Sequence, residues 1–186
     1  MFAVRGVFEG YEYGLAQIAS MRSLSEEFIK DIHERTALDC QPYARGSYRN
    51  SAVLIAGAPV SPADPLHIRD LMADLVHAYR NSRQNKIVRA CVFHILFENI
   101  HPFIDGNGRT GRTILNLMLR DMGVPPAALK DADRRKYLSM LAQGQLQLNP
   151  DPFVEFVISA IESELSLREE LIIKTRIAVG DAAQCQ

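Results

Sequence analysis

The sequence predicts a mostly α-helical fold with one short β-hairpin. Several segments repeat apolar residues at the 3.6-residue period of a helix, whereas the segment 40–65 is interrupted by prolines and glycines around a short β-branched run. No linker, repeat or low-complexity stretch divides the chain, and its 186 residues fit one domain, which we place at 1–180. Residues 181–186 follow Gly180 at the end of the sequence and are expected to fray.

Charge and cysteine usage limit the classes of partner and the compartment. The 21 Lys and Arg residues nearly balance the 22 Asp and Glu residues, so no overall positive field favours nucleic acid or an anionic membrane, and neither is expected as a partner. Cys40, Cys91 and Cys185 are odd in number and form no CxxC pair, which indicates reduced thiols. No leader region and no apolar run of the roughly 18 residues that a bilayer requires is present. We therefore expect a cytoplasmic protein.

The first helix is predicted over 23–38. Ser23 and Glu26 lie three residues apart and have the pattern of a capping box at its start. An apolar stripe follows at helical spacing, so one face of this helix is expected to pack against a core. The stripe consists of Leu24, Phe28, Ile29 and Ile32.

The other helices follow the interrupted segment. The segment 65–81 restores an amphipathic helical period, and 86–100 is apolar almost all round, which is typical of a central helix covered on every side. The segment 112–126 predicts a helix that ends at glycine and proline stop signals. The segments 131–145 and 151–174 supply two further helices.

The stretch HPFIDGNGRTGRT, residues 101–113, gathers most of the chemistry. Gly106, Asn107 and Gly108 lie at the start of a helix, where unpaired backbone N–H groups and the positive end of the helix dipole form an anion hole. The glycines let a ligand oxygen approach the backbone, and the asparagine tolerates a left-handed turn while adding an amide. This pattern is typical of a phosphate site.

Charged residues on both sides extend the predicted phosphate site. Arg109 and Arg112 lie three apart on the following helix, so both guanidinium groups can reach the same polyphosphate. Asp105 supplies the hard oxygen ligand that Mg²⁺ on a nucleotide requires. His101 lies outside the anion hole and is suited to take a proton from an incoming hydroxyl.

Two alternative interpretations of the motif are open. A polar turn between helices also carries charged residues, but it does not need a histidine, two arginines and GNG together. Residues 106–113 also spell GxxxxGRT, the P-loop pattern with Arg112 in place of its lysine, although a P-loop leaves a buried strand and a long helix precedes this one. The two sites differ at Gly111. It lies in the phosphate cradle of a P-loop, but otherwise it is an ordinary helix position where alanine is expected to be harmless or slightly stabilising.

The stretch HPFIDGNGR, together with Arg112, resembles the signature HxFx(D/E)GNGRxxR of the Fic (filamentation induced by cAMP) family at every fixed position. The resemblance implies a Fic-type helical bundle and an adenylyltransferase that moves AMP from Mg·ATP to a Ser, Thr or Tyr hydroxyl of a target protein or of itself. It also implies a role for each motif residue. These are His101 as general base, Asp105 as Mg²⁺ ligand, Gly106, Asn107 and Gly108 as anion hole, Arg109 and Arg112 as phosphate clamps, and Phe103 as a core anchor.

Other activities within the family remain open. One branch of the family phosphorylates its target and carries a lysine at the first arginine's place, so Gly108 and Arg109 place this sequence with the nucleotidyl transferases. Transfer of another nucleotide and removal of AMP also occur in the family. A binding module that keeps the fold without chemistry is the alternative from another class, but it has no need of an intact His101 and Asp105.

The segment GSYRNSAVLIAGA resembles the target-binding flap of the family. Val53, Leu54 and Ile55 are expected to form an apolar hairpin edge, within 51–58, that pairs with an extended target segment. A solvent-exposed ribbon without function is the alternative. Tyr137 matches in rough position an aromatic residue that lines the family's adenine pocket, and a core tyrosine is equally compatible with it.

The remaining histidines carry less chemistry. His94 and Glu98 precede the motif, but an apolar helix favours a core histidine over a metal ligand, and Cys91 on the same helix is expected in the core. His33, His67 and His77 are expected on exposed helix faces.

Many members of the family are restrained by an inhibitory helix that reads (S/T)xxxE(G/N). No segment of this sequence matches that pattern in full. A regulatory helix therefore precedes the first residue, comes from an antitoxin-like partner or is absent, and the sequence does not decide between a monomer and a homodimer.

Overall fold

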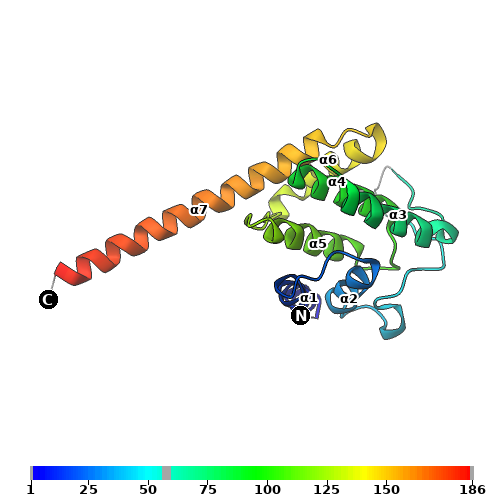
Figure 1. Ribbon diagram of the computed structural model, residues 1–186, viewed down its shortest axis with the longest axis horizontal. Coiled ribbons are helices and arrows are strands. Elements are labelled where there is room, and N and C mark those ends of the chain that lie inside the picture. The colour runs from blue at the N-terminus through cyan, green and yellow to red at the C-terminus, as the bar shows by residue number, and fades with distance from the viewer. Residues whose placement is uncertain (1, 56–59, 185–186) are drawn as a thin grey trace.

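The computed structural model describes residues 2–55 and 60–184 and is mostly helical (Figure 1). Its helices, in chain order, are α1 (Phe2–Ala19), α2 (Glu26–Thr36), α3 (Ile68–Asn81), α4 (Lys86–Ile100), α5 (Asn107–Asp121), α6 (Arg134–Gln147) and α7 (Asp151–Gln184). Short 3₁₀ turns lie at Pro42–Ala44, Pro65–His67 and Asp131–Asp133. None of the helices in the described ranges is both long and apolar enough to span a bilayer.

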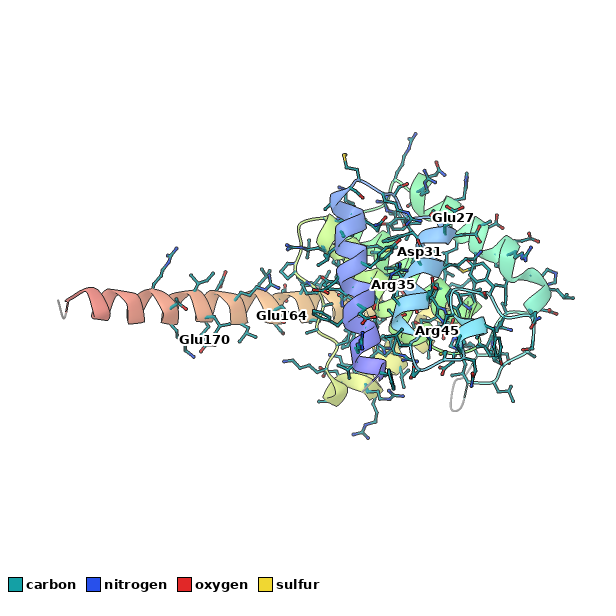
Figure 2. All side chains as sticks on the ribbon, turned by 90° about the horizontal axis from the view of Figure 1, so that it is seen from below. Glu27, Asp31, Arg35, Arg45, Glu164 and Glu170 are labelled. Atoms are coloured by element: carbon teal, nitrogen blue, oxygen red, sulfur yellow. The ribbon has the colours of Figure 1, made fainter. Side chains whose placement is uncertain are left out.

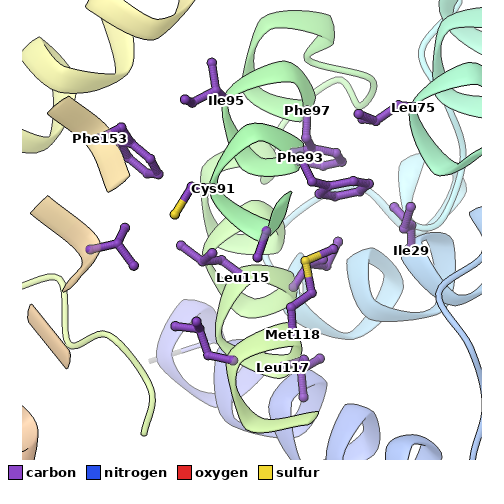
Figure 3. Close-up of a cluster of buried hydrophobic side chains, with 14 of the residues drawn as sticks. Ile29, Leu75, Cys91, Phe93, Ile95, Phe97, Leu115, Leu117, Met118 and Phe153 are labelled. Carbon is purple, nitrogen blue, oxygen red and sulfur yellow. The ribbon is translucent and has the colours of Figure 1, made fainter. Parts of the chain in front are cut away.

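Helix α4 is the centre of the fold, as its apolar sequence predicted. It contacts α3, α5, α6 and α7, while α1 packs against α2 and α5. Asn85 caps its start by accepting the N–H of Ile87 at 2.9 Å. Apolar side chains from five helices meet around it, and Cys91 is buried among them as predicted (Figure 3). The close-up labels Ile29, Leu75, Phe93, Ile95, Phe97, Leu115, Leu117, Met118 and Phe153.

The start of α2 differs from the prediction. The helix begins at Glu26, and its cap is Ser25, whose hydroxyl accepts the N–H of Phe28 at 3.1 Å. The capping box predicted for Ser23 and Glu26 is therefore wrong, because a cap must directly precede the first helical residue. The carboxylate of Glu26 instead accepts the hydroxyl of Tyr48 at 3.1 Å, which ties α2 to the loop after it.

Helix α1 was not predicted by the sequence, because three glycines lower its helix propensity. Gly6, Gly10 and Gly14 recur every fourth residue and are all buried. A Cβ at Gly6 would lie 2.7 Å from the carbonyl oxygen of Thr36, and a Cβ at Gly14 would collide with Leu117. The glycine stripe therefore lets α1 approach α2 and α5 more closely than residues with a Cβ would allow at these positions.

Polar contacts add to the packing of α1 on α2, which run side by side in Figure 2. The hydroxyl of Tyr13 donates to Asp31 at 2.8 Å, and Arg22 pairs with the same carboxylate oxygen at 2.8 Å. The guanidinium group of Arg35 lies 3.7 Å from the centre of the Tyr13 ring, within cation–π distance. The N-terminal helix is thereby attached to the helix that supports the motif.

Two regions leave predictions open. Residues 51–55 form no strand, and 56–59 lie outside the described residues, so the predicted hairpin over 51–58 stays a prediction. Helix α7 continues to Gln184, and its distal half extends away from the helical body, beyond Glu164 and Glu170 (Figures 1 and 2). Fraying of 181–186 stays a prediction. Cys40 and Cys91 are free thiols, and Cys185 lies outside the described residues.

Candidate functional site

The motif begins where α4 ends. His101 is the C-cap residue of α4, with φ at 53°, and its N–H donates to the carbonyl of Phe97 at 2.9 Å. This left-handed conformation, which is uncommon for a residue with a Cβ, turns the chain sharply out of the helix. The imidazole ring is largely buried and lies at the wall of the candidate site described below.

Asn107 holds the motif loop in shape. Its side-chain oxygen accepts the N–H of Phe103 at 2.8 Å, and its side-chain N–H donates to the carbonyl of the same residue at 2.8 Å. Both polar groups of the buried side chain are thereby bonded inside the loop. Asn107 therefore shapes the loop. The sequence suggested that its side-chain amide contributes to the anion hole, but both polar groups of that amide are bonded to Phe103.

His33 supports the same loop from α2, and its predicted exposure is wrong. The side chain is fully buried and stacks on Phe103, with the ring centres 3.7 Å apart. Its Nδ1 accepts the N–H of Gly46, so the proton lies on Nε2, which donates to the carbonyl of Asp105 at 2.9 Å. Burial lowers the pKa of His33 to about 4, so the neutral form prevails near pH 7.

Arg49, which precedes the predicted flap, is also buried and was not predicted by the sequence as a site residue. Its guanidinium group donates to the carbonyls of His101 at 2.8 Å, Ser51 at 2.8 Å and Ala63 at 2.6 Å. Its backbone N–H donates to the carbonyl of Pro102 at 2.9 Å. One side chain thus connects both ends of the segment 51–63 to the first residue of the motif.

An open cavity of about 930 Å³ brings the motif together with α6. Most of the residues predicted for the site line this cavity, as do two basic residues that the sequence did not single out, Lys130 and Arg134. The predicted residues that line it are Ile55, His101, Asp105, Gly106, Asn107, Gly108, Arg109, Arg112 and Tyr137. The volume lies within the range of small-molecule sites, and the basic side chains favour an anionic ligand.

The two motif arginines have different surroundings. Arg109 pairs with Asp39, which follows α2, and also donates to the carbonyl of Thr36 at 3.4 Å. The guanidinium group of Arg112 lies 5.9 Å from the centre of the Tyr137 ring. Both arginines line the same cavity, which agrees with their predicted i, i+3 placement on one helix face.

Tyr137 is buried at the edge of the cavity and is also part of the core. Its hydroxyl lies 2.9 Å from Nε2 of His94, and its ring packs edge-on against Phe153. His94 is 1% exposed, so the core role predicted for this histidine is confirmed, and burial lowers its pKa to about 3. Within the described ranges, no three His, Cys, Asp or Glu side chains gather into a metal-binding group.

The three residues predicted for the flap edge are in different environments. Ile55 lines the cavity, Leu54 is 96% exposed, and Val53 is half-buried. An exposed leucine beside a cavity-lining isoleucine leaves apolar surface at the mouth of the site.

Gly111 is not an ordinary helix position. A Cβ there would collide with Glu98 and lie 3.1 Å from the ring of Phe97, because α5 packs closely on α4 at this point. The expectation that alanine is harmless at Gly111 is therefore wrong. It follows that loss of function on Gly111→Ala does not distinguish a P-loop from the predicted site.

One family model matches more than half of the chain. The model described as Fic/DOC family covers residues 23–119, which hold α2 to α4, most of α5 and the whole motif. A protein adenylyltransferase Fic of Drosophila willistoni is 28% identical over 168 residues, which cover 88% of this chain and 33% of that protein.

Two solved structures have the same fold. Fic-1 from C. elegans has a TM-score of 0.81 at 26% identity, over 94% of this chain and 52% of that chain. A Fic family protein from Desulfovibrio desulfuricans G20 has a TM-score of 0.76 at 30% identity, over 92% of this chain and 53% of that chain. The sequence therefore spans about a third of the Drosophila protein and about half of each solved chain.

Proposed function

The chain belongs to the Fic/DOC family, and on that premise we propose that it is a protein adenylyltransferase that moves AMP from ATP to a Ser, Thr or Tyr hydroxyl of a target protein. The observation that carries the proposal is the shared cavity, which combines a helix N-terminus, two arginines and a histidine. The relatives named protein adenylyltransferase support AMP as the group that is transferred.

The proposed reaction assigns a step to each group. His101 takes the proton of the target hydroxyl, whose oxygen attacks the α-phosphorus of ATP. A new P–O bond forms, the bond from the α-phosphorus to the bridging oxygen breaks, and pyrophosphate leaves. The N-terminus of α5, with Gly106 in the left-handed conformation at φ 78°, offers its N–H groups to the phosphates.

The arginines are proposed to hold the leaving group. Arg109 contacts the β-phosphate and Arg112 the γ-phosphate, and Lys130 and Arg134 add positive charge across the cavity. Tyr137 is an aromatic residue that lines the same cavity, which supports a contact with the adenine.

Mg²⁺ fits the proposed site through Asp105. Its carboxylate is exposed at the cavity, with one oxygen bonded to the N–H of Gly106 at 2.6 Å. A single exposed carboxylate suits a cation that keeps several waters and binds substrate phosphates. When bound, Mg²⁺ would neutralise part of the phosphate charge.

The segment 51–55 is proposed to position the target. Ile55 at the cavity wall and exposed Leu54 offer apolar surface to an extended target segment, and Arg49 ties this segment to His101. Pairing of the target's backbone with residues 53–55 would bring its hydroxyl to the histidine.

Labelled nucleotides test the proposal. The protein is incubated with labelled ATP or labelled UTP in Mg²⁺, and adducts on itself and on lysate proteins are located by mass spectrometry. We expect AMP adducts, which His101→Ala reduces by about 10² to 10⁴ while ATP binding stays nearly intact. His77→Ala, on an exposed face of α3, is the control. Uridylyl adducts, AMP removal from modified proteins, or no adduct at all would contradict the proposal.

A chelator tests the metal. Asp105→Ala should weaken ATP binding in Mg²⁺ and have little effect in EDTA, because its proposed role acts through the cation. Equal effects in both conditions would remove Asp105 from the metal site.

A further inference from the structure

Glu98 is a buried acid that the proposed reaction does not yet use. It lies one turn before His101 on the last turn of α4, and its side chain is 7% exposed. Its Oε2 is 4.0 Å from Nδ1 of His101. Two atoms of this pair, Oε1 of Glu98 and Nδ1 of His101, are buried and have no hydrogen-bond partner among the residues that the structure describes. Such atoms are rare in folded proteins because their desolvation is not compensated.

The described residues around the pair do not supply a hydrogen-bond partner for these two atoms. Gly111 of α5 packs directly on Glu98, so no side chain from that position can reach the carboxylate. Charged and titratable groups from other elements face the pair at longer range. Arg112 from α5 and Tyr137 from α6 face Glu98, and Arg49 and Asp105 from the two loops face His101.

The placement of Nδ1 determines which nitrogen of His101 is free. Nδ1 is buried on the side of Glu98, whereas the residue as a whole lines the cavity. The nitrogen left for a target hydroxyl is therefore Nε2. For Nε2 to act as the base, the proton of the neutral ring must lie on Nδ1. A hydrogen-bond acceptor beside Nδ1 stabilises this tautomer.

We propose that Glu98 is a positioning residue for His101, whose carboxylate accepts the Nδ1–H, keeps Nε2 unprotonated and stabilises the imidazolium that forms during transfer. This inference rests on the proposed role of His101 as general base. Nε2 takes the hydroxyl proton, Nδ1 keeps its own, and the carboxylate of Glu98 gains no proton. A movement of about 1 Å brings the pair from 4.0 Å to hydrogen-bonding distance, and such contacts often tighten when substrate binds.

The electrostatics of the pair agree with this arrangement. Burial raises the pKa of Glu98 to about 7, and burial also lowers the pKa of His101. Burial therefore disfavours the charge of either group, whereas Arg112 favours the charge of Glu98 and Asp105 favours that of His101. The backbone carbonyl of Glu98 also raises the pKa of His101, which makes it a competing acceptor for the Nδ1–H.

Two substitutions separate the carboxylate from the backbone carbonyl. Glu98→Gln removes the charge and keeps the shape. Glu98→Met removes both charge and acceptor, and it is expected to fold because replacing an unpaired buried acid by an apolar residue of similar size is seldom destabilising. Glu155→Gln and Glu155→Met make the same chemical changes at an exposed position of α7 and serve as controls.

The experiment has one readout for activity and one for the ring. We expect both Glu98 variants to slow AMP incorporation from labelled ATP by about tenfold or more, as part of the 10²- to 10⁴-fold that a general base supplies. Affinity for α,β-methylene ATP should stay within about twofold. In ¹⁵N NMR, His101 of the unchanged protein should carry its proton on Nδ1, and Glu98→Met should lose this preference.

The outcomes separate the inference from the proposed function. An unchanged rate and an unchanged ring tautomer in both variants would overturn the inference, because the backbone carbonyl would then suffice. A parallel loss of rate and of α,β-methylene ATP binding would also overturn it, since Glu98 would then shape the nucleotide site. If the unchanged protein does not transfer AMP, the proposed function fails, while the tautomer measurement still decides whether Glu98 positions the ring.

Discussion

Nε2 of His33 donates to the backbone carbonyl of Asp105 at 2.9 Å, so a buried residue of α2 holds the loop that carries the motif. The other ring nitrogen accepts the N–H of Gly46, and this second bond requires the neutral ring. Protonation would place a positive charge in a buried site and remove the acceptor. The support of the motif therefore depends on the charge of one histidine.

Stability is expected to fall on acidification below pH 6.5. Burial lowers the pKa of His33 from 6.5 to about 4. Above pH 6.5 both states are neutral, whereas between 6.5 and 4 only the unfolded chain takes up the proton. The free energy of unfolding should therefore drop by about 1.4 kcal/mol per pH unit for each such histidine. Buried His94, with its pKa lowered to about 3, adds a loss of the same sign.

Urea unfolding at several pH values between 7 and 4.5 measures this slope. His33→Gln should be less stable at pH 7 and show a shallower dependence on pH. His77→Gln, on an exposed face of α3, should leave the slope of the unchanged protein. An identical slope in His33→Gln would mean that another group titrates.

Gly108 and Gly111 should respond oppositely to alanine. The nearest atoms to a Cβ at Gly108 belong to the movable end of Arg112, with Nη1 at 3.1 Å, whereas a Cβ at Gly111 would collide with Glu98. Gly108→Ala should retain stability and lower nucleotide affinity, by about tenfold, because it blocks close approach to the backbone. Gly111→Ala should lower stability by about 1–3 kcal/mol, because it overpacks the contact of α5 with α4.

Unfolding in urea and calorimetry with α,β-methylene ATP separate the two effects. A stable Gly111→Ala protein that has lost the nucleotide would contradict this assignment and return support to a P-loop.

The two motif arginines should differ in the phosphate that they bind. Arg112→Ala is expected to weaken ATP binding far more than ADP binding, while Arg109→Ala should weaken both. A lost charge-assisted contact is worth about 1.5 to 3 kcal/mol, or roughly one to two decades in affinity. Arg109 must also exchange or share its contact with Asp39.

Titration calorimetry with both nucleotides measures the difference. Arg135→Ala, exposed on α6, is the control. Equal losses for ATP and ADP in Arg112→Ala would remove this residue from the γ-phosphate.

Arg49→Lys tests the connection between the segment 51–63 and His101. A lysine has one donor group and cannot reach the carbonyls of His101, Ser51 and Ala63 together. We expect a loss of about 1–3 kcal/mol in stability and slower transfer to a protein target, with binding of α,β-methylene ATP nearly unchanged. Arg45→Lys is the matched control, because Arg45 donates to carbonyls near its own loop, those of Leu38 and Cys40. Equal losses of transfer in both variants would contradict the proposed connection.

The elements that local pattern determines were predicted well. Lys86–Ile100 and Ile68–Asn81 match the predicted segments closely, because their apolar residues recur without interruption. Helix α1 was missed because its glycines lower helix propensity, although their regular spacing of four residues is itself a signal of close helix packing. Local preference and tertiary packing disagree in this helix, and packing decides.

In the site, too, local features were predictable from the sequence and long-range contacts were not. The motif residues are adjacent in sequence, so their gathering could be predicted, whereas the contacts that support them join residues about 50 to 70 positions apart. His33 follows Ile29 by four positions and therefore lies on the buried face of α2, which the sequence did contain as a signal. Nothing local indicated that Arg49 would lie against His101.

The acceptors around Arg49 have a consequence for how the protein can vary. All four carbonyls that its guanidinium group contacts, those of Ser51, Ala63, Ile100 and His101, belong to the backbone and are present whatever side chains those positions carry. Substitutions at the intervening positions therefore leave these bonds in place, provided that the segment keeps its length. If this segment contacts the target, as proposed, its side chains can change from one target to another while its ends stay attached beside the same histidine.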